Sequence, residues 1–209
     1  GEVRGNELAR HPAQLWYDLA DDNNGFAVLT DATKDYEILE DSEDKTIAMG
    51  LVRCTRLRIA CDGRLWMEYP GDESSQSLRK FSYRYAFMPH TDKWDKAGLY
   101  NAGLAFNAPL KVCEFGKQEG IFDTDKSFVE IEGENLVLSS VTRSEEDTML
   151  IRMYNPTEET INGRLNVGYD IKEAYAVKLD GSRKEKLEVS NGSITLSVGK
   201  GKIYTVEVV

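Results

Sequence analysis

Residues 135–155 read NLVLSSVTRSEEDTMLIRMYN and consist of two apolar runs that flank an acidic stretch. In NLVLSSV and MLIRMYN, apolar side chains recur with a period of two, as in strands that bury one face. The stretch SEED between them is interpreted as a solvated turn, as are DLADD and EILEDSED earlier in the chain. The segment therefore predicts two antiparallel strands joined by a short polar connection.

Runs of the same kind follow one another along the chain. Examples are FAVLT, KTIAMGLVRCTRLRI, KFSYRYAF, GRLNVGY and IYTVEVV, and turn-forming sequences such as DDNNG, CDG, NG and GKG separate them. No stretch of a dozen residues shows a clean period of 3.6, which argues against long helices. These patterns predict an all-β protein built from sandwiches.

The pattern changes near residue 126. Earlier segments are longer and rich in aromatics, whereas later strands recur at the short spacing typical of small sandwiches. We expect a large β-sandwich-type domain, complete or incomplete, over residues 1–125 and a small antiparallel β-sandwich over residues 126–209. Alternation allows only one of two adjacent residues at the centre of a core. Candidates for the second core are Leu136 or Val137, Leu150, Ile151, Leu165, Val167, Ile194, Leu196, Tyr204 and Val206.

The charge balance argues against two classes of partner. The 209 residues carry a net charge of −10, which repels nucleic acid and anionic membranes. No apolar run reaches the roughly 18 residues that indicate a membrane-spanning helix, and the first residues lack the pattern of a signal peptide.

Three cysteines are too few for a disulfide framework, so free thiols in a reducing compartment are expected. We expect a cytoplasmic protein, with homo-oligomerisation left open.

Residues 83–94, YRYAFMPHTDKW, raise the question of a catalytic cluster. The alternation predicts a strand with Tyr83, Tyr85 and Phe87 on one buried face. Proline cannot donate to a ladder, so the pairing is expected to end at Pro89. His90 is then interpreted as a structural histidine that contacts a neighbour.

Two tryptophans are candidates for contact with a neighbouring domain or for stacking on a sugar. Trp94 follows His90, and Trp66 lies in a separate strand-like run. Tryptophan in a β protein belongs more often to a core or an interface than to a sugar platform. Their roles are therefore open between these alternatives.

A search for catalytic and metal-binding motifs finds none. The chain has two histidines, His11 and His90, and neither H-x-x-H, H-E-x-x-H nor a suitable cysteine pair occurs. G-x-S-x-G and a phosphate-binding glycine loop are also missing from the sequence. Glycoside hydrolysis uses a pair of carboxyl groups, but nothing singles out two of the 36 acidic residues. We predict no catalytic residue and no metal ligand in this chain.

Four collinear segments resemble glycoside hydrolase family 38, the α-mannosidases. HPAQLWYDLADDNNGFAVLTDATKDYEI (11–38) is similar to the stretch that follows the catalytic and helical domains there. IAMGLVRCTR (47–56), YRYAFMPHTDKW and LAFNAPL (104–110) are similar to successive strands and strand exits of the large β domain. NLVLSSVTRSEEDTMLIRMYNPTEET (135–160) resembles the final small sandwich with its Arg-x-Tyr-Asn signature. The bacterial branch that includes mannosylglycerate hydrolases looks nearest.

The resemblance implies a non-catalytic C-terminal region of a zinc-dependent retaining α-mannosidase. In that family the nucleophilic aspartate and the zinc site lie on an N-terminal barrel, which no part of this chain resembles. The start at Gly1, without a methionine, fits a fragment of such an enzyme. Its expected partners are the N-terminal catalytic and helical domains of the same polypeptide and an α-mannoside substrate, and its expected role is that of scaffold and cleft wall.

One residue is implied to reach the substrate. Family members place an arginine at the end of the strand that KTIAMGLVR resembles, and Arg53 holds the matching position. A guanidinium group can grip sugar hydroxyls or a carboxylate while it stays charged. Arg56 and Arg58 follow closely, so the register of this match is uncertain by a few residues.

A free-standing carbohydrate-binding sandwich is the alternative, and a purely structural interaction module is a third reading. Coplanar exposed aromatics beside polar groups would favour the binding module. An exposed apolar surface would favour a region that docks against other domains.

Overall fold

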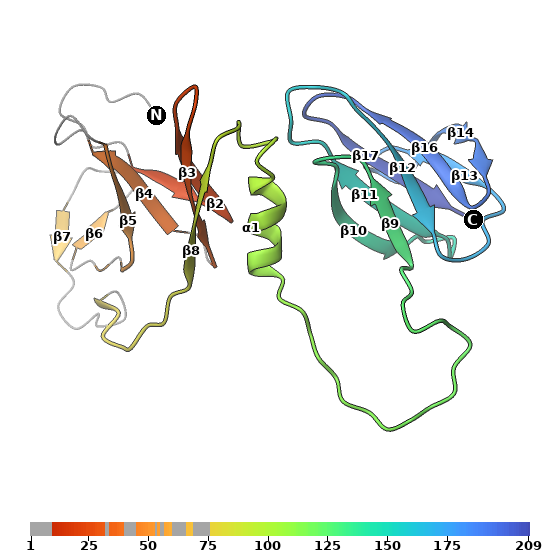
Figure 1. The fold of residues 1–209 in the computed structure, drawn as a ribbon, viewed down its shortest axis with the longest axis horizontal. Helices are drawn as coiled ribbons and strands as arrows, with labels where there is room; N and C mark the ends of the chain where they lie inside the picture. The colour runs from red at the N-terminus through yellow and green to blue at the C-terminus, as the bar shows by residue number, and fades with distance from the viewer. Residues whose placement is uncertain are drawn as a thin grey trace. The chain divides into compact units, whose positions relative to one another are not determined.

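The computed structural model describes residues 10–31, 34–39, 45–52, 54, 57–59, 66–68 and 76–209, with only the backbone given for Lys34, 57–59 and 66–68. The chain divides into two compact units, Gly1–Leu110 and Lys111–Val209 (Figure 1). The described residues are mainly antiparallel strands, so the predicted all-β class is confirmed. The predicted domain boundary at residues 125 and 126 falls in the irregular segment before the first strand of the second unit, and it stays a prediction.

The second unit is a sandwich of two antiparallel sheets. One sheet has the order β10-β11-β17-β13-β14 and the other β15-β16-β12-β9. The strands are β9 (Val129–Glu132), β10 (Val137–Arg143), β11 (Met149–Tyr154), β12 (Ile161–Val167), β13 (Ala174–Val177), β14 (Arg183–Leu187), β15 (Val189–Ser190), β16 (Ser193–Val198) and β17 (Ile203–Val208). The opening motif of the sequence forms β10, the acidic turn and β11, as expected.

The core of the sandwich lies between the sheets and uses most of the predicted positions. Its buried residues are Leu136, Ile151, Met153, Leu165, Val167, Ala174, Ile194, Leu196, Val198, Val206 and Val208. Leu150 is only half-buried, because it alternates with the core residues Ile151 and Met153 on β11. Tyr204 is also half-buried, but it lies on the same face of β17 as Val206 and packs against the core. Leu136 and Val137 are both buried, but only Leu136 belongs to the core cluster, as alternation predicts for two adjacent residues.

The two edges of the five-stranded sheet are shaped differently. On β10, the register shifts between Leu138 and Ser140, so the ladder is interrupted by a bulge. On β14, the residues from Arg183 to Lys186 are exposed and charged. Both features are ways in which natural sheets limit pairing with foreign strands.

Asn155, in the Arg-x-Tyr-Asn signature, joins two connections of the sandwich. Its side chain is buried, and Nδ2 lies 2.6, 2.9 and 3.2 Å from the carbonyl oxygens of Glu159, Val198 and Gly199. Its Oδ1 accepts from the backbone N–H and the hydroxyl of Thr157 at 2.8 and 2.7 Å. One amide therefore fastens the β11–β12 loop to the β16–β17 hairpin.

The first unit contains two three-stranded sheets and a short helix. The sheets have the orders β1-β4-β5 and β2-β3-β8, and a further hairpin pairs β6 with β7. The elements are β1 (His11–Ala13), β2 (Trp16–Ala20), β3 (Gly25–Thr30), β4 (Lys34–Leu39), β5 (Thr46–Gly50), β6 (Leu57–Ile59), β7 (Trp66–Glu68), β8 (Tyr85–His90) and α1 (Leu99–Asn107).

The β2-β3-β8 sheet uses its two faces differently. On one face, Tyr17 and Val28 are buried and pack near Tyr36, Ile47 and Met49 of the other sheet. On the opposite face, α1 packs against β2 and β3. The central strand β3 is therefore covered on both sides.

Helix α1 was not predicted, and it includes the start of LAFNAPL, which the resemblance assigned to strands and strand exits. With nine residues it is too short to produce a sustained 3.6 period. It begins after Gly98, whose φ is 70°, and Gly103 faces Trp16 so closely that a Cβ there would lie 2.8 Å from the indole. Asn107 Nδ2 donates to Thr30 O at 2.9 Å and ties the end of the helix to β3.

Strand β8 corrects two expectations about residues 83–94. Tyr85 and Phe87 share a face as predicted, but they are 49% and 60% exposed rather than buried. Pro89 does not end the strand, because it still pairs with Phe26 and the ladder continues to His90. Since β8 is an edge strand of its sheet, its proline needs no partner for the missing N–H.

We expect Asn155→Ala to lower the free energy of unfolding of the second unit by about 2–4 kcal/mol, because several buried backbone groups lose their partner. Asn155→Asp keeps the acceptor but turns an oxygen toward three carbonyls, so it should destabilise at least as much. All three tryptophans lie in the first unit, so unfolding should be followed by NMR of second-unit methyl groups in urea. The control Asn162→Ala, at an exposed position of β12, should change stability by less than about 0.5 kcal/mol; an equal loss would contradict the role of Asn155.

Candidate functional site

His90 lies at the end of β8 against β2 and β3. Its Nε2 is 3.0 Å from Asp18 Oδ1, and its Nδ1 is 2.6 Å from the backbone oxygen of Asp92. The ring also lies over Gly25, its partner in the ladder, where a Cβ would come within 2.1 Å of it. Glycine at position 25 is therefore what allows the imidazole to reach Asp18 across the sheet.

Both ring nitrogens of His90 face oxygen acceptors, and this arrangement favours the charged imidazolium. A neutral imidazole has one N–H to donate, whereas the imidazolium has two. The hydrogen bond to Asp18 raises the pKa of His90 above its ordinary value, burial opposes this shift, and the carbonyl of Asp92 adds to it. The side chains of His90 and Asp18 are only 5% and 12% exposed. The hydrogen bonds of His90 link β2, β8 and the following turn.

Asp18 was missed in the sequence, where DLADD was interpreted as a solvated turn. Asp21 in that stretch does act as a turn residue, since its carboxylate accepts from the N–H groups of Asn23 and Asn24. Asp18 belongs to β2, on the face that carries Trp16. The signal that could have found the pair is Gly25, because glycine inside a strand marks a close approach.

Trp94 lies in an aromatic cluster beside the helix. Its ring centroid is 5.7 Å from that of Trp16 and 6.5 Å from that of Tyr100. The indole is half-buried, so one part of it stays accessible. Trp16 and Trp94 are close in sequence to Asp18 and His90. Whether Trp94 also contacts a sugar or another domain stays a prediction.

Two predicted site residues cannot be placed. Arg53 lies outside the described residues, and of Trp66 only the backbone in β7 is described. The role of Arg53 in substrate contact and the role of Trp66 in stacking therefore stay predictions.

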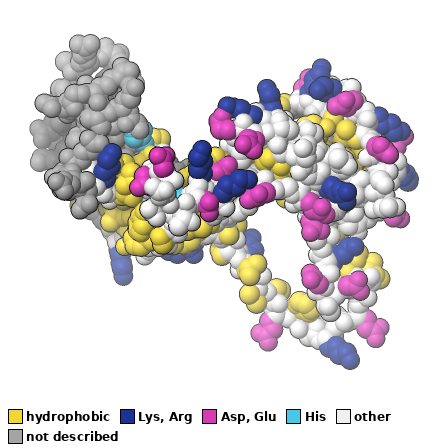
Figure 2. All heavy atoms as spheres, turned by 45° about the horizontal axis from the view of Figure 1, so that its top comes forward, with side chains coloured by type: hydrophobic (Ala, Val, Ile, Leu, Met, Phe, Trp, Pro, Cys, Tyr) yellow, Lys and Arg dark blue, Asp and Glu magenta, His cyan; other side chains and the backbone are white. Residues whose placement is uncertain are grey.

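An apolar surface lies on the first unit, formed by Phe26, Tyr85 and Phe87, which are 41%, 49% and 60% exposed. We call these three residues the apolar face. It borders a hollow of about 440 Å³ whose walls also include Tyr17, Leu19 and Ile47. Figure 2 shows hydrophobic side chains gathered on the described part of this unit.

The rings of the apolar face do not form a flat platform. Phe26 and Phe87 have centroids 5.4 Å apart with their planes inclined by 31°, and Tyr85 and Phe87 are inclined by 55° at 5.6 Å. A sugar ring stacks on an exposed flat aromatic surface, whereas an irregular apolar surface suits packing against protein side chains. The geometry favours a protein neighbour for this face.

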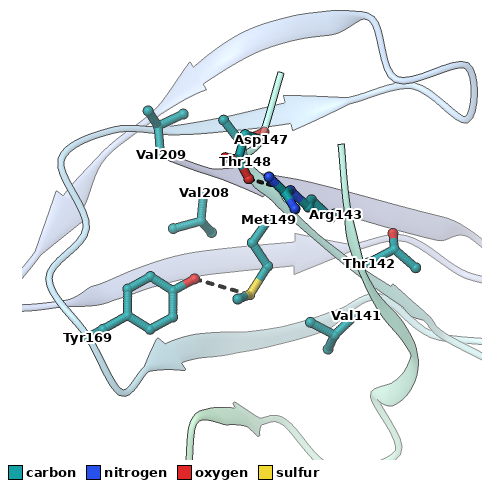
Figure 3. Close-up of a pocket in the computed structure, with 9 residues that line it drawn as sticks. All are labelled: Val141, Thr142, Arg143, Asp147, Thr148, Met149, Tyr169, Val208 and Val209. Atoms are coloured by element: carbon teal, nitrogen blue, oxygen red, sulfur yellow. Dashed lines mark hydrogen bonds and ion pairs between the residues drawn. The ribbon is translucent and has the colours of Figure 1, made fainter. Parts of the chain in front are cut away.

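A second hollow, of about 530 Å³, lies on the sandwich (Figure 3). Tyr169 donates its hydroxyl to Met149 Sδ at 3.0 Å on one side, and Arg143 pairs with Asp147 on another. Val141 and Val208 complete apolar walls. The hollow offers a single aromatic ring, Tyr169, which is fewer than the two or three that the carbohydrate-binding alternative requires.

The most buried charge of the sandwich is Glu207, and its oxygens are occupied. Arg183 donates from Nε and Nη2 to the two carboxylate oxygens at 2.7 and 3.1 Å, and Thr148 donates its hydroxyl at 2.7 Å. The hydrogen bond from Arg183 holds the pKa of Glu207 below its usual value. The guanidinium also lies 4.1 Å from the centre of the Tyr175 ring. This arrangement makes Glu207 a structural carboxylate rather than a catalytic acid or base.

The described residues assemble no group of three or more His, Cys, Asp or Glu positioned to hold a metal ion. Cys54 and Cys113 are exposed free thiols. Within the same described part of the chain, no helix has the length and apolarity needed to cross a membrane.

These features define an all-β protein whose second unit is an antiparallel sandwich. Residues 135–206 of that sandwich match the family model for the C-terminal beta sandwich domain of glycosyl hydrolases family 38. Residues 135–206 are therefore similar to this domain family, in agreement with the sequence resemblance of residues 135–160. None of the curated proteins matches the chain.

The chain also shares its fold with two solved structures from Enterococcus faecalis. A protein in glycosyl hydrolase family 38 superimposes with a TM-score of 0.75 and 16% identity, over 96% of this chain and 22% of that chain. An α-mannosidase from strain V583 gives a TM-score of 0.76 and 16% identity, over 97% of this chain and 21% of that one. The chain thus spans about a fifth of the length of either structure.

We expect the His90–Asp18 pair to stabilise the first unit in a pH-dependent way. A raised folded-state pKa gives stability that is fully present below the unfolded value of about 6.5 and is lost as the pH rises through the folded pKa. His90→Gln should therefore destabilise the unit more at about pH 5.5 than at about pH 9. Urea unfolding followed by tryptophan fluorescence, which reports the first unit, measures both.

Asp18→Asn serves as the matched variant, because it removes the charge that the imidazolium faces while keeping the size of the side chain. Its free energy of unfolding should depend less on pH between those two values than that of the unsubstituted chain. A cost of His90→Gln that is the same at both pH values would show that His90 is held as a neutral ring.

Proposed function

We propose that this chain is the non-catalytic C-terminal β region of a zinc-dependent, retaining α-mannosidase that acts on α-mannosides. In this proposal it serves as a scaffold and as one wall of the substrate cleft. The family 38 match of residues 135–206 and the likeness in fold to an α-mannosidase support it. The free thiols of Cys54 and Cys113 agree with a bacterial cytoplasmic location, which we include in the proposal.

The apolar face is the observation that carries the scaffold role. Fully burying one large apolar side chain stabilises a protein by about 1.5–3 kcal/mol, and Phe26, Tyr85 and Phe87 leave much of that unrealised. In the two structures that share this fold, about four-fifths of the chain lies outside the matched part. Other domains are therefore available to cover the surface. We infer that the face packs against the catalytic or helical domains of the same polypeptide.

The zinc ion of the proposed enzyme does not fit the described residues of this chain, because they bring no suitable set of ligands together. Zinc sites use three or four Cys, His or carboxylate ligands around one point. We therefore assign the metal and the nucleophile to the other domains. The described part of this chain then contributes packing, and Arg53 is the residue proposed to contact substrate.

The free-standing carbohydrate-binding module is less well supported. The rings of the apolar face are inclined to one another, and the hollow beside Tyr169 has one aromatic ring. A sugar-binding site of this kind normally combines aromatic stacking with convergent polar groups. Neither the apolar face nor the hollow beside Tyr169 has that arrangement.

We predict that Phe87→Ser leaves the isolated chain nearly unchanged in stability but destabilises the full-length polypeptide. A half-exposed side chain contributes little by itself, whereas a buried docking contact contributes about 1–3 kcal/mol. The measurement compares the thermal unfolding of the two forms. Leu179→Ser, at an exposed turn position of the second unit, is the control and should affect neither form. Equal small effects of both substitutions in the full-length polypeptide would contradict docking by this face.

We also predict that Arg53→Ala in the full-length polypeptide lowers kcat/KM for an aryl α-mannoside about ten- to a hundredfold. A charge-assisted hydrogen bond to substrate is worth roughly 1.5–3 kcal/mol, whereas an exposed salt bridge contributes under about 1 kcal/mol to stability and nothing to turnover. Arg56→Ala and Arg58→Ala are the matched controls for the register. Unchanged kcat/KM in all three variants would contradict a role of this chain in substrate binding. If the full-length polypeptide has no α-mannosidase activity that a chelator abolishes, the proposed function is wrong.

A further inference from the structure

An extended segment with exposed apolar side chains precedes the sandwich. We call residues 110–122, LKVCEFGKQEGIF, the arm. Leu110, Val112 and Ile121 are 97%, 95% and 93% exposed, and Phe115 is 73% exposed. In the part of the chain that the structure describes, the main chain of the arm makes no hydrogen bond. Figure 2 shows hydrophobic side chains along the loop that carries the arm.

The composition of the arm differs from that of a solvated linker. Flexible linkers are rich in Gly, Ser or Pro and poor in aromatic and β-branched residues. In an extended chain, Leu110 and Val112 point to one side together with Glu114, and Cys113 and Phe115 point to the other together with Lys111. Two apolar residues and one charged residue on each side suit a strand at the edge of a sheet. With its backbone N–H and C=O groups also unpaired, residues 110–115 have the features of a strand that lacks its sheet.

The charges of the arm indicate what kind of surface covers it. Lys111 and Lys117 balance Glu114 and Glu119, so the arm is neutral although the whole chain carries −10. A neutral apolar strand selects an apolar edge rather than a charged one. A second copy of this chain would bring another −10 close to the first, which disfavours that occupant.

We propose that residues 110–115 of the arm add as a strand to an apolar sheet edge or groove of the remaining part of the same polypeptide, with Ile121 as a second contact. This inference rests on the proposed function, because it takes the catalytic and helical domains as the occupant. Addition of a strand to an exposed edge is an established mode of recognition, in which backbone hydrogen bonds give affinity and alternate side chains give specificity. The structures that share this fold leave about four-fifths of their length for such a surface.

Hydrogen exchange of the backbone amides tests the proposal, with the full-length polypeptide and the isolated chain measured side by side. Amides of residues 110–115 should exchange freely in the isolated chain and at least about tenfold more slowly in the full-length polypeptide. Leu110→Ser with Val112→Ser should abolish that protection, because the side-chain contacts that hold the strand are removed. Gln118→Ser, an exposed polar position of the same arm, should leave the protection unchanged.

Two results would overturn the proposal. One is free exchange of residues 110–115 in a full-length polypeptide that is folded and active. The other is protection in the isolated chain that grows with its concentration, which would identify a second copy as the occupant. A protected arm in a polypeptide without α-mannosidase activity would refute the proposed function and support the strand addition, so the two failures are distinguishable.

Discussion

The amide of Asn155 is the interaction on which the sandwich most depends. A β-sandwich holds its sheets together by apolar packing, which is non-directional and does not by itself fix how the connecting loops run. Asn155 supplies direction, because it is buried and satisfies carbonyl groups from both the β11–β12 loop and the β16–β17 hairpin. Its neighbours Ile151 and Met153 on β11 are fully buried in the core. This asparagine therefore fixes two connecting segments relative to the core strand β11.

In the first unit, a hydrogen bond between His90 and Asp18 joins distant segments, as the Asn155 amide does in the sandwich. His90 and Asp18 face each other across a sheet that Gly25 leaves open at that point, and α1 packs on the same sheet. The far face of the sheet is only partly covered, and it is there that Phe26, Tyr85 and Phe87 stay exposed. One face of this sheet is therefore fixed by specific contacts, whereas the other leaves apolar side chains exposed.

The sequence allowed good prediction where strands alternate with a solvated surface. The opening motif, the sandwich and most of its core follow from period-two patterns, because each strand there has one wet and one dry face. Prediction failed at β8, where Tyr85 and Phe87 were expected to be buried, because an exposed apolar surface and a core have the same composition. It also failed at α1, which is held by contacts of Gly103 and Asn107 rather than by a long period.

The candidate site was less predictable than the fold for a physical reason. His90 was interpreted as a structural histidine, and that role stays a prediction. Its partner Asp18 lies 72 residues earlier, and pairing over that distance leaves no local pattern. Gly25, which lies opposite the His90 ring, is the sequence feature that indicates this pair. Arg53 rests on a family resemblance, and its position in space is not described.

The interrupted ladder of β10 and the charged strand β14 have a consequence for how the protein is made. Newly synthesised chains crowd one another while the arm and the apolar face are still uncovered, and flat sheet edges would capture such segments from neighbouring molecules. The bulge at Leu138 and Ser140 and the charges on β14 deny them a matching partner. The sandwich can thus complete its own folding without pairing with such segments of a neighbouring molecule.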